Sequence, residues 1–148
     1  MPGLEDLYRE IILDHYRSPR NRGELPPPAH KAEGHNPLCG DEITVFVQLD
    51  GDVVSDVKVS GQGCSISQSS ASMMSQAIKG KSLDEVRALV HRFKVMMSIE
   101  EDADDAAAPT VKLGDLEALQ GVVKFPVRIK CATLGWNTLL DALDAAKA

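Results

Sequence analysis

A thiol and a carboxylate lie two residues apart in the stretch around Cys39 and Asp41. Pro37 disfavours helix at the residue before it, and Gly40 lets the backbone turn tightly between the two reactive side chains. In a reducing compartment, this pattern is typical of half of a metal site or of an activated nucleophile. The pair alone does not decide between these two functions, so the other cysteines have to be considered.

The chain contains three cysteines, Cys39, Cys64 and Cys131. Their odd number and wide spacing make a poor disulfide framework. Together with Asp41 they form a set of three sulfurs and one oxygen, which suits tetrahedral zinc. Because the spacings are long, the residues alone leave two possibilities open: one shared metal site or three separate thiols.

Two cations, Arg128 and Lys130, come shortly before Cys131. Next to a metal site they would offset the negative charge of its ligands and stabilise the thiolates. The alternative interpretation is that both are ordinary surface cations at the start of a helix.

A predicted hairpin brings two of the cysteines together. Apolar residues alternate over residues 43–49, which predicts a strand, and Asp50-Gly51 is a strong hairpin turn. The return strand over residues 53–59 leads the chain back to Cys64. We therefore expect Cys64 to lie near the start of the first strand, close to Cys39.

Helical spacing of apolar residues predicts helices over residues 4–17, 66–79, 82 to about 98, 115–120 and from Pro126 onward. Cys64 and Cys131 lie near the starts of two of these helices, where the helix dipole stabilises a thiolate. His15 lies beside the apolar stripe of the first helix, and we interpret it as a hydrogen-bonded packing residue. Residues 24–38 contain three consecutive prolines and are predicted to form an extended connection without regular structure.

Length and charge restrict the class of protein. We expect residues 1–148 to form one domain. Five carboxylates within residues 100–105 account for most of the net charge of −6, which would otherwise be −1. This acidic loop argues against nucleic acid as a partner. The sequence shows no signal peptide and no apolar run long enough for a membrane helix, so we expect a cytoplasmic protein without membrane contact.

Several short motifs follow one another along the chain: Leu7-Tyr8-Arg9-Glu10-Ile11-Ile12-Leu13-Asp14-His15-Tyr16, Pro19-Arg20-Asn21, Asn36-Pro37-Leu38-Cys39-Gly40-Asp41, Gly61-Gln62-Gly63-Cys64-Ser65-Ile66-Ser67, Gly80-Lys81-Ser82-Leu83 and Lys130-Cys131-Ala132-Thr133-Leu134. In these motifs the chain resembles the SufU-type sulfur-transfer proteins, relatives of the IscU iron–sulfur scaffolds, over nearly its whole length. Lys130 stands where IscU-type scaffolds have a histidine, and the long interval between Cys64 and Cys131 is similar to the SufU branch.

The resemblance implies an α+β fold, with a small antiparallel β-sheet of about three strands packed against several α-helices. It also implies zinc (Zn2+) held by Cys39, Asp41, Cys64 and Cys131. Cys39 would leave the metal on docking and accept persulfide sulfur from a SufS-type cysteine desulfurase, for downstream iron–sulfur assembly proteins. Arg128 would orient Cys39 or contact the partner.

Two other functions stay open at this point. The same ligands could assemble a [2Fe–2S] cluster, because such clusters bind thiolates. Alternatively, the zinc could be purely structural, in which case its removal would unfold the chain.

Overall fold

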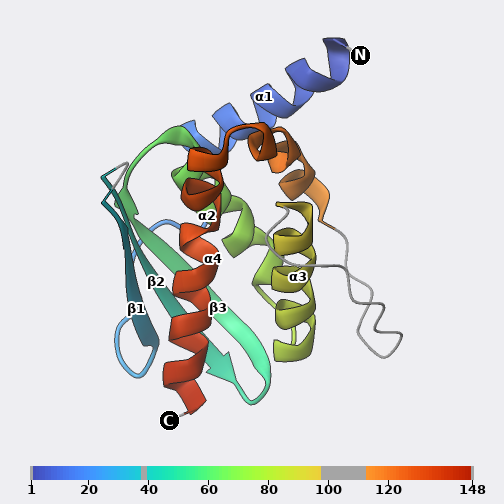
Figure 1. Cartoon of the computed structure of the whole chain (residues 1–148). Coiled ribbons are helices and arrows are strands. Elements are labelled where there is room, and N and C mark those ends of the chain that lie inside the picture. The colour runs from blue at the N-terminus through green and yellow to red at the C-terminus, as the bar shows by residue number, and fades with distance from the viewer. Residues whose placement is uncertain (1, 38–39, 98–112, 148) are drawn as a thin grey trace.

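The structure is a computed structural model, and it describes residues 2–37, 40–97 and 113–147 (Figure 1). Three strands form one sheet, and helices from both halves of the chain pack around it. The elements follow in the order α1 (Pro2–Arg17), β1 (His30–Asn36), β2 (Asp41–Asp50), β3 (Val53–Gln62), α2 (Ser65–Ile78), α3 (Leu83–Met96), the 3-10 helix η1 (Gly114–Lys124) and α4 (Pro126–Lys147). The predicted α+β class with a three-stranded antiparallel sheet is confirmed.

The sheet has the order β1-β2-β3, and both strand pairs are antiparallel. The β2–β3 hairpin turns at Asp50-Gly51, as predicted. Its register places Glu42 opposite Gln62, so the chain leaves β3 beside the residues that open β2.

The prediction of an extended connection over residues 24–38 is wrong for its second half, because residues 30–36 form β1. This strand lies at the edge of the sheet and is defined by its backbone pairing with β2, not by an apolar face. Gly34 lets it approach α4, since a β-carbon at this position would clash with the Thr138 hydroxyl.

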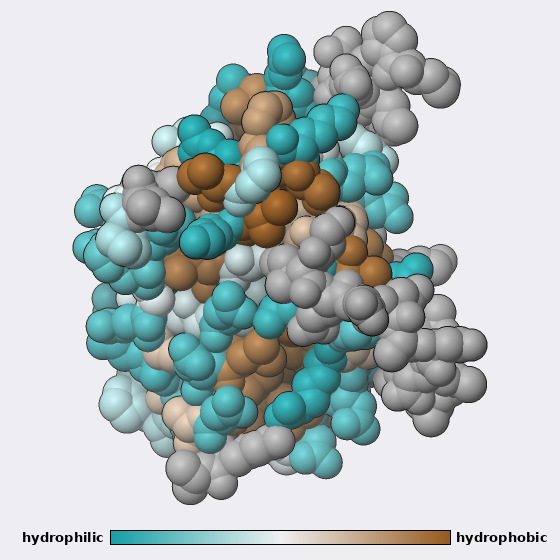
Figure 2. All heavy atoms as spheres, in the orientation of Figure 1, coloured by the Kyte–Doolittle hydropathy of each residue, from teal (hydrophilic) through white to brown (hydrophobic). Residues whose placement is uncertain are grey.

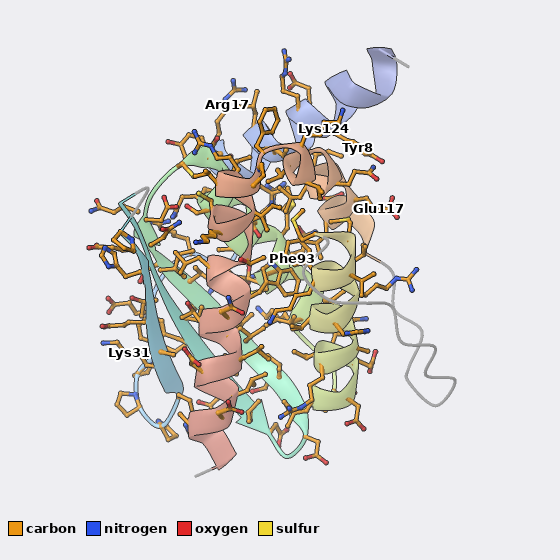
Figure 3. All side chains as sticks on the ribbon, viewed as in Figure 1. Tyr8, Arg17, Lys31, Phe93, Glu117 and Lys124 are labelled. Carbon is orange, nitrogen blue, oxygen red and sulfur yellow. The ribbon has the colours of Figure 1, made fainter. Side chains whose placement is uncertain are left out.

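The core lies where α4 crosses β1 and β2 and where α2 packs on β3 and α4. Phe93 of α3 projects toward α4 (Figure 3), and its ring stacks on Trp136 with the centroids 4.3 Å apart. Met73 and Met74 of α2 are buried in this core. Burial of such side chains supplies most of the stability of a domain of this size.

The predicted helices are all present, with small shifts at their ends. A capping box begins α3, because the Ser82 hydroxyl accepts a hydrogen bond from the Glu85 amide at 3.2 Å. The acidic stretch of residues 100–105 lies outside the described residues. None of the helices in the described part is long and apolar enough to cross a membrane.

His15 joins three helices from a fully buried position. Its Nδ1 lies 2.8 Å from the Ser72 hydroxyl of α2, and its Nε2 lies 3.1 Å from a carboxylate oxygen of Asp115 in η1. The Ser72 hydroxyl also accepts a hydrogen bond from the backbone N–H of Arg20 at 2.8 Å. The interpretation of His15 as a hydrogen-bonded packing residue is therefore confirmed.

Candidate metal centre

Three of the four predicted ligands lie together at one end of the sheet. Asp41 opens β2, Cys64 caps the N-terminus of α2, and Cys131 lies in the second turn of α4. One ligand atom from each of these side chains lies within 4.8 Å of the other two. Cys39 lies outside the described residues. The structure thus brings together Asp41, Cys64 and Cys131, which are far apart in the sequence.

Asp41 is fully buried, although a carboxylate is costly to remove from water unless it is paired. Its Oδ1 accepts a hydrogen bond from the backbone N–H of Cys64 at 2.8 Å, and its Oδ2 lies 3.8 Å from Cys64 Sγ. Among the described residues, no cationic side chain forms an ion pair with Asp41. Oδ1 is thus held by the backbone, and Oδ2 lies beside the Cys64 sulfur.

Cys64 has extended backbone angles and occupies the N-cap position of α2. Its sulfur accepts a weak hydrogen bond from the Ser67 amide, with the two atoms 3.5 Å apart. Cys64 is half-buried, so the centre reaches solvent on its side. The prediction that the hairpin brings Cys64 to the start of β2 is confirmed by its contact with Asp41.

Cys131 is fully buried in α4. The side-chain amide of Asn36 donates to its sulfur at 3.9 Å, a long contact of the kind that sulfur acceptors make. Asn36 ends β1 and lies directly opposite Asp41 in the strand register, which explains why it reaches the centre. The sequence analysis did not identify Asn36 as a site residue, although it stands three residues before Cys39 in one of the motifs.

Gly63 is the second site residue that the sequence analysis missed. A β-carbon at this position would clash with Asp41 Oδ1 and lie 2.7 Å from the Ser67 hydroxyl. The buried carboxylate therefore occupies the space that a side chain would need. The signal in the sequence is a glycine immediately before a ligand cysteine, which marks a close approach of the backbone.

Helices α2 and α4 are tied together beside the centre, and this fixes the separation of the two described thiols. The Ser70 hydroxyl donates to the Ala132 carbonyl at 2.5 Å and accepts from Trp136 Nε1 at 3.1 Å. Ser70 and Trp136 are both buried, so these bonds form in surroundings where an unmade bond would be costly. The small serine side chains of α2 allow this close packing.

Arg128 and Lys130 are both exposed near the start of α4, on the turn that precedes Cys131. This placement agrees with either interpretation of the two cations, and the role of Arg128 stays a prediction.

The donor set fits a metal ion on chemical grounds. Two thiols and one uncompensated buried carboxylate converge, and zinc binds both ligand types in tetrahedral sites. A cation at this point would neutralise the carboxylate that has no cationic partner in the described part of the chain. Asp41, Cys64 and Cys131 supply three positions, and Cys39 stands two residues before Asp41 in the sequence.

Comparisons with known proteins show the family to which the chain belongs. Residues 7–143 match the family described as the NifU-like N terminal domain. The chain is 51% identical to the zinc-dependent sulfurtransferase SufU of Bacillus subtilis over 136 residues, which cover 92% of this chain and 88% of that protein. It is 41% identical to the iron–sulfur cluster assembly scaffold protein IscU of Streptococcus pyogenes, over 95% of this chain and 84% of the relative.

A solved structure gives the same result for the fold. The putative iron–sulfur cluster assembly scaffold protein for the SUF system from Fervidobacterium islandicum superposes with a TM-score of 0.79 at 34% identity. The match covers 90% of this chain and 94% of that one. From its sequence and its fold, this chain belongs to the family of NifU-like N-terminal domains.

Proposed function

We propose that this protein is a zinc-dependent sulfurtransferase, which accepts persulfide sulfur from a SufS-type cysteine desulfurase for iron–sulfur cluster biogenesis. The observation that carries the proposal is the buried Asp41 carboxylate, which faces two thiols and has no cationic partner in the described part of the chain. The 51% identity to a relative named as a zinc-dependent sulfurtransferase supports the same function.

Asp41, Cys64 and Cys131 would hold the zinc together with Cys39. When bound, zinc lowers the proton affinity of its ligands and keeps the thiols as thiolates. The protein holds Asp41 through the Cys64 amide and leaves room for its carboxylate at Gly63. These contacts preset the ligands before any metal arrives.

The transfer itself is a thiol exchange at Cys39. The Cys39 thiolate attacks the terminal sulfur of the donor's persulfide and forms a new S–S bond. The S–S bond of the donor breaks, and its electron pair leaves with the donor's cysteine thiolate. The exchange needs no external oxidant or reductant, because one persulfide is replaced by another. We expect the product to pass to downstream iron–sulfur assembly proteins, in the cytoplasm, where thiols stay reduced.

Metal analysis combined with a desulfurase assay tests the proposal. We expect about one zinc per chain, stimulation of the desulfurase by the wild type, and loss of stimulation in Cys39→Ser. Labelled sulfur transferred from the desulfurase should appear on the wild-type chain and not on this variant. A Cys39→Ser chain that still takes up labelled sulfur would contradict the assignment of the acceptor.

A [2Fe–2S] scaffold is the second candidate, favoured by the 41% identity to a relative named as an IscU scaffold. Thiolate ligands suit such a cluster as well as zinc. Reconstitution with iron and sulfide separates the two functions. A stable visible absorbance in the wild type that is lost in both Cys64→Ser and Cys131→Ser would favour the scaffold.

A further inference from the structure

Large hydrophobic side chains are exposed at the junction between η1 and α4. Phe125 is 62% exposed and Val127 is 60% exposed, more than the other large hydrophobic residues in the described part of the chain. Figure 2 shows hydrophobic side chains gathered over this part of the molecule, with hydrophilic ones around them. We call residues 125–127 the Phe125–Val127 patch. Clustered exposure of this kind is typical of an interaction site, whereas single exposed residues need no explanation.

Along the chain, the patch is flanked by positive charge in an otherwise acidic protein. Lys124, Arg128 and Lys130 flank it, and no Asp or Glu occurs between residues 118 and 140, although the whole chain has a net charge of −6. Lys124 lies where η1 leads into α4, at the upper end of the view in Figure 3. Cations near a helix N-terminus oppose the helix dipole, so the dipole of α4 does not favour basic residues at this place. Basic residues next to an exposed apolar group are complementary to a partner with acidic residues next to an apolar pocket.

The patch lies next to the candidate metal centre. The backbone carbonyl of Val127 is 4.0 Å from Cys131 Sγ, one helical turn further along α4. A partner seated on the patch would therefore place its own surface beside the ligands. In the described part of the chain, Phe125 forms hydrogen bonds through its backbone, and its exposed side chain is accessible to a partner.

We propose that the Phe125–Val127 patch is the docking site of the sulfur donor, a protein with acidic side chains around an apolar pocket that receives Phe125. This inference rests on the proposed function, because it takes the donor to be the desulfurase. Phe125 acts as the buried aromatic anchor, of the kind that dominates binding energy at protein interfaces. Lys124 adds long-range attraction, which speeds association and is screened by salt.

Surface substitutions test the docking site with little risk to folding. The double variant Phe125→Ser/Val127→Ser and the single variant Lys124→Glu are compared with Val53→Ser, the matched control. Val53 is 40% exposed beside the β2–β3 turn, at the opposite end of the molecule from the start of α4 (Figure 1). Binding is measured by calorimetry with the purified SufS-type cysteine desulfurase from the organism that encodes this chain. Zinc content and far-UV circular dichroism should be the same in all four proteins.

We expect the double variant to raise the Kd for the desulfurase by about tenfold or more, because the loss of a buried aromatic side chain from an interface typically weakens binding by this much. Stimulation at saturating concentrations should be retained. Lys124→Glu should weaken binding at low salt and reduce its salt dependence, and Val53→Ser should change neither. An unchanged Kd in the double variant would overturn the docking site.

Two other outcomes separate this inference from its alternatives. If the wild type neither binds nor stimulates the desulfurase, the proposed function fails before the docking site is tested. If the double variant changes the oligomeric state in light scattering but not the Kd for the desulfurase, the patch joins two copies of this chain and the inference is overturned.

Discussion

The substitution Gly63→Ala should weaken metal binding although it removes no ligand. The added β-carbon would clash with Asp41 Oδ1 and lie 2.9 Å from Asp41 Cγ. Non-bonded carbon atoms keep about 3.5–4.0 Å apart, so the carboxylate has to move by the order of an ångström. Metal–ligand distances tolerate only about 0.2 Å, so a shift of this size takes Asp41 out of bonding range.

The expected loss of zinc affinity is estimated from the hydrogen bond between Cys64 and Asp41, which this movement breaks. The Cys64 amide donates to Asp41 Oδ1 at 2.8 Å, and a hydrogen bond to a charged group contributes about 1.5–3 kcal/mol. Since 1.4 kcal/mol corresponds to a tenfold change in affinity, we expect the Kd for zinc to rise about 10- to 100-fold. Backbone strain in Gly63→Ala does not contribute to this loss of affinity. Gly63 is not among the glycines with positive φ, so alanine can adopt its backbone conformation.

Competition with a chromogenic zinc chelator measures this change. Gly121→Ala is the matched control, because a β-carbon at Gly121 meets no atom within 4 Å. Urea unfolding of both metal-free variants measures the loss of folding stability separately from the loss of zinc affinity. Overpacking of a core costs about 1–3 kcal/mol in the free energy of unfolding. A Kd for zinc within twofold of the wild type in Gly63→Ala would refute the reasoning that the carboxylate needs this space.

Three further substitutions have expected outcomes. Asn36→Ala removes the amide that donates to Cys131 Sγ, so zinc affinity should fall several-fold in the chelator assay while the fold persists in circular dichroism. His15→Ala leaves a buried cavity and breaks the links between three helices, so urea unfolding should show a loss of about 2–4 kcal/mol. The hydrogen bond from Arg20 holds the pKa of Asp14 below its ordinary value of 3.8, so this pair stabilises the fold above that value. The contribution is lost as the pH falls through the lower folded pKa. The small stability difference between Asp14→Asn and wild type at pH 7, measured by urea unfolding over a pH series, should therefore shrink as the pH falls below 3.8 and vanish below the folded pKa of Asp14.

The hairpin and the cysteine positions were predictable because their signals are local. Alternating apolar residues over 43–49 fix which face of β2 is buried, and the turn at Asp50-Gly51 then returns the chain to Cys64. The meeting of Cys64 with Asp41 follows from this register. The approach of Cys131 depends on how α4 packs across the sheet. The residue types left it open, and the family resemblance then indicated it.

The first strand could not be predicted from hydrophobic spacing. Residues 30–36 contain a single aliphatic side chain, Ala32, and the strand exists because its backbone pairs with β2 and lies close to α4. Asn36 was missed for the same reason, because its place opposite Asp41 depends on that pairing. The space at Gly63 also depends on a contact between residues that are 22 positions apart in the sequence. Such tertiary contacts leave no periodic signal in the sequence.

The hydrogen bond between the Cys64 amide and Asp41 joins two of the proposed ligands into a single preorganised unit. The ties between Ser70, Trp136 and Ala132 add Cys131 to that unit, so the folded chain presents a tridentate chelator. Folding already bears the entropy cost of bringing these ligands together, so metal binding does not include that cost. Since the ligands come from β2, α2 and α4, a bound ion would raise the melting temperature of all three elements together, by an amount set by its concentration relative to its Kd.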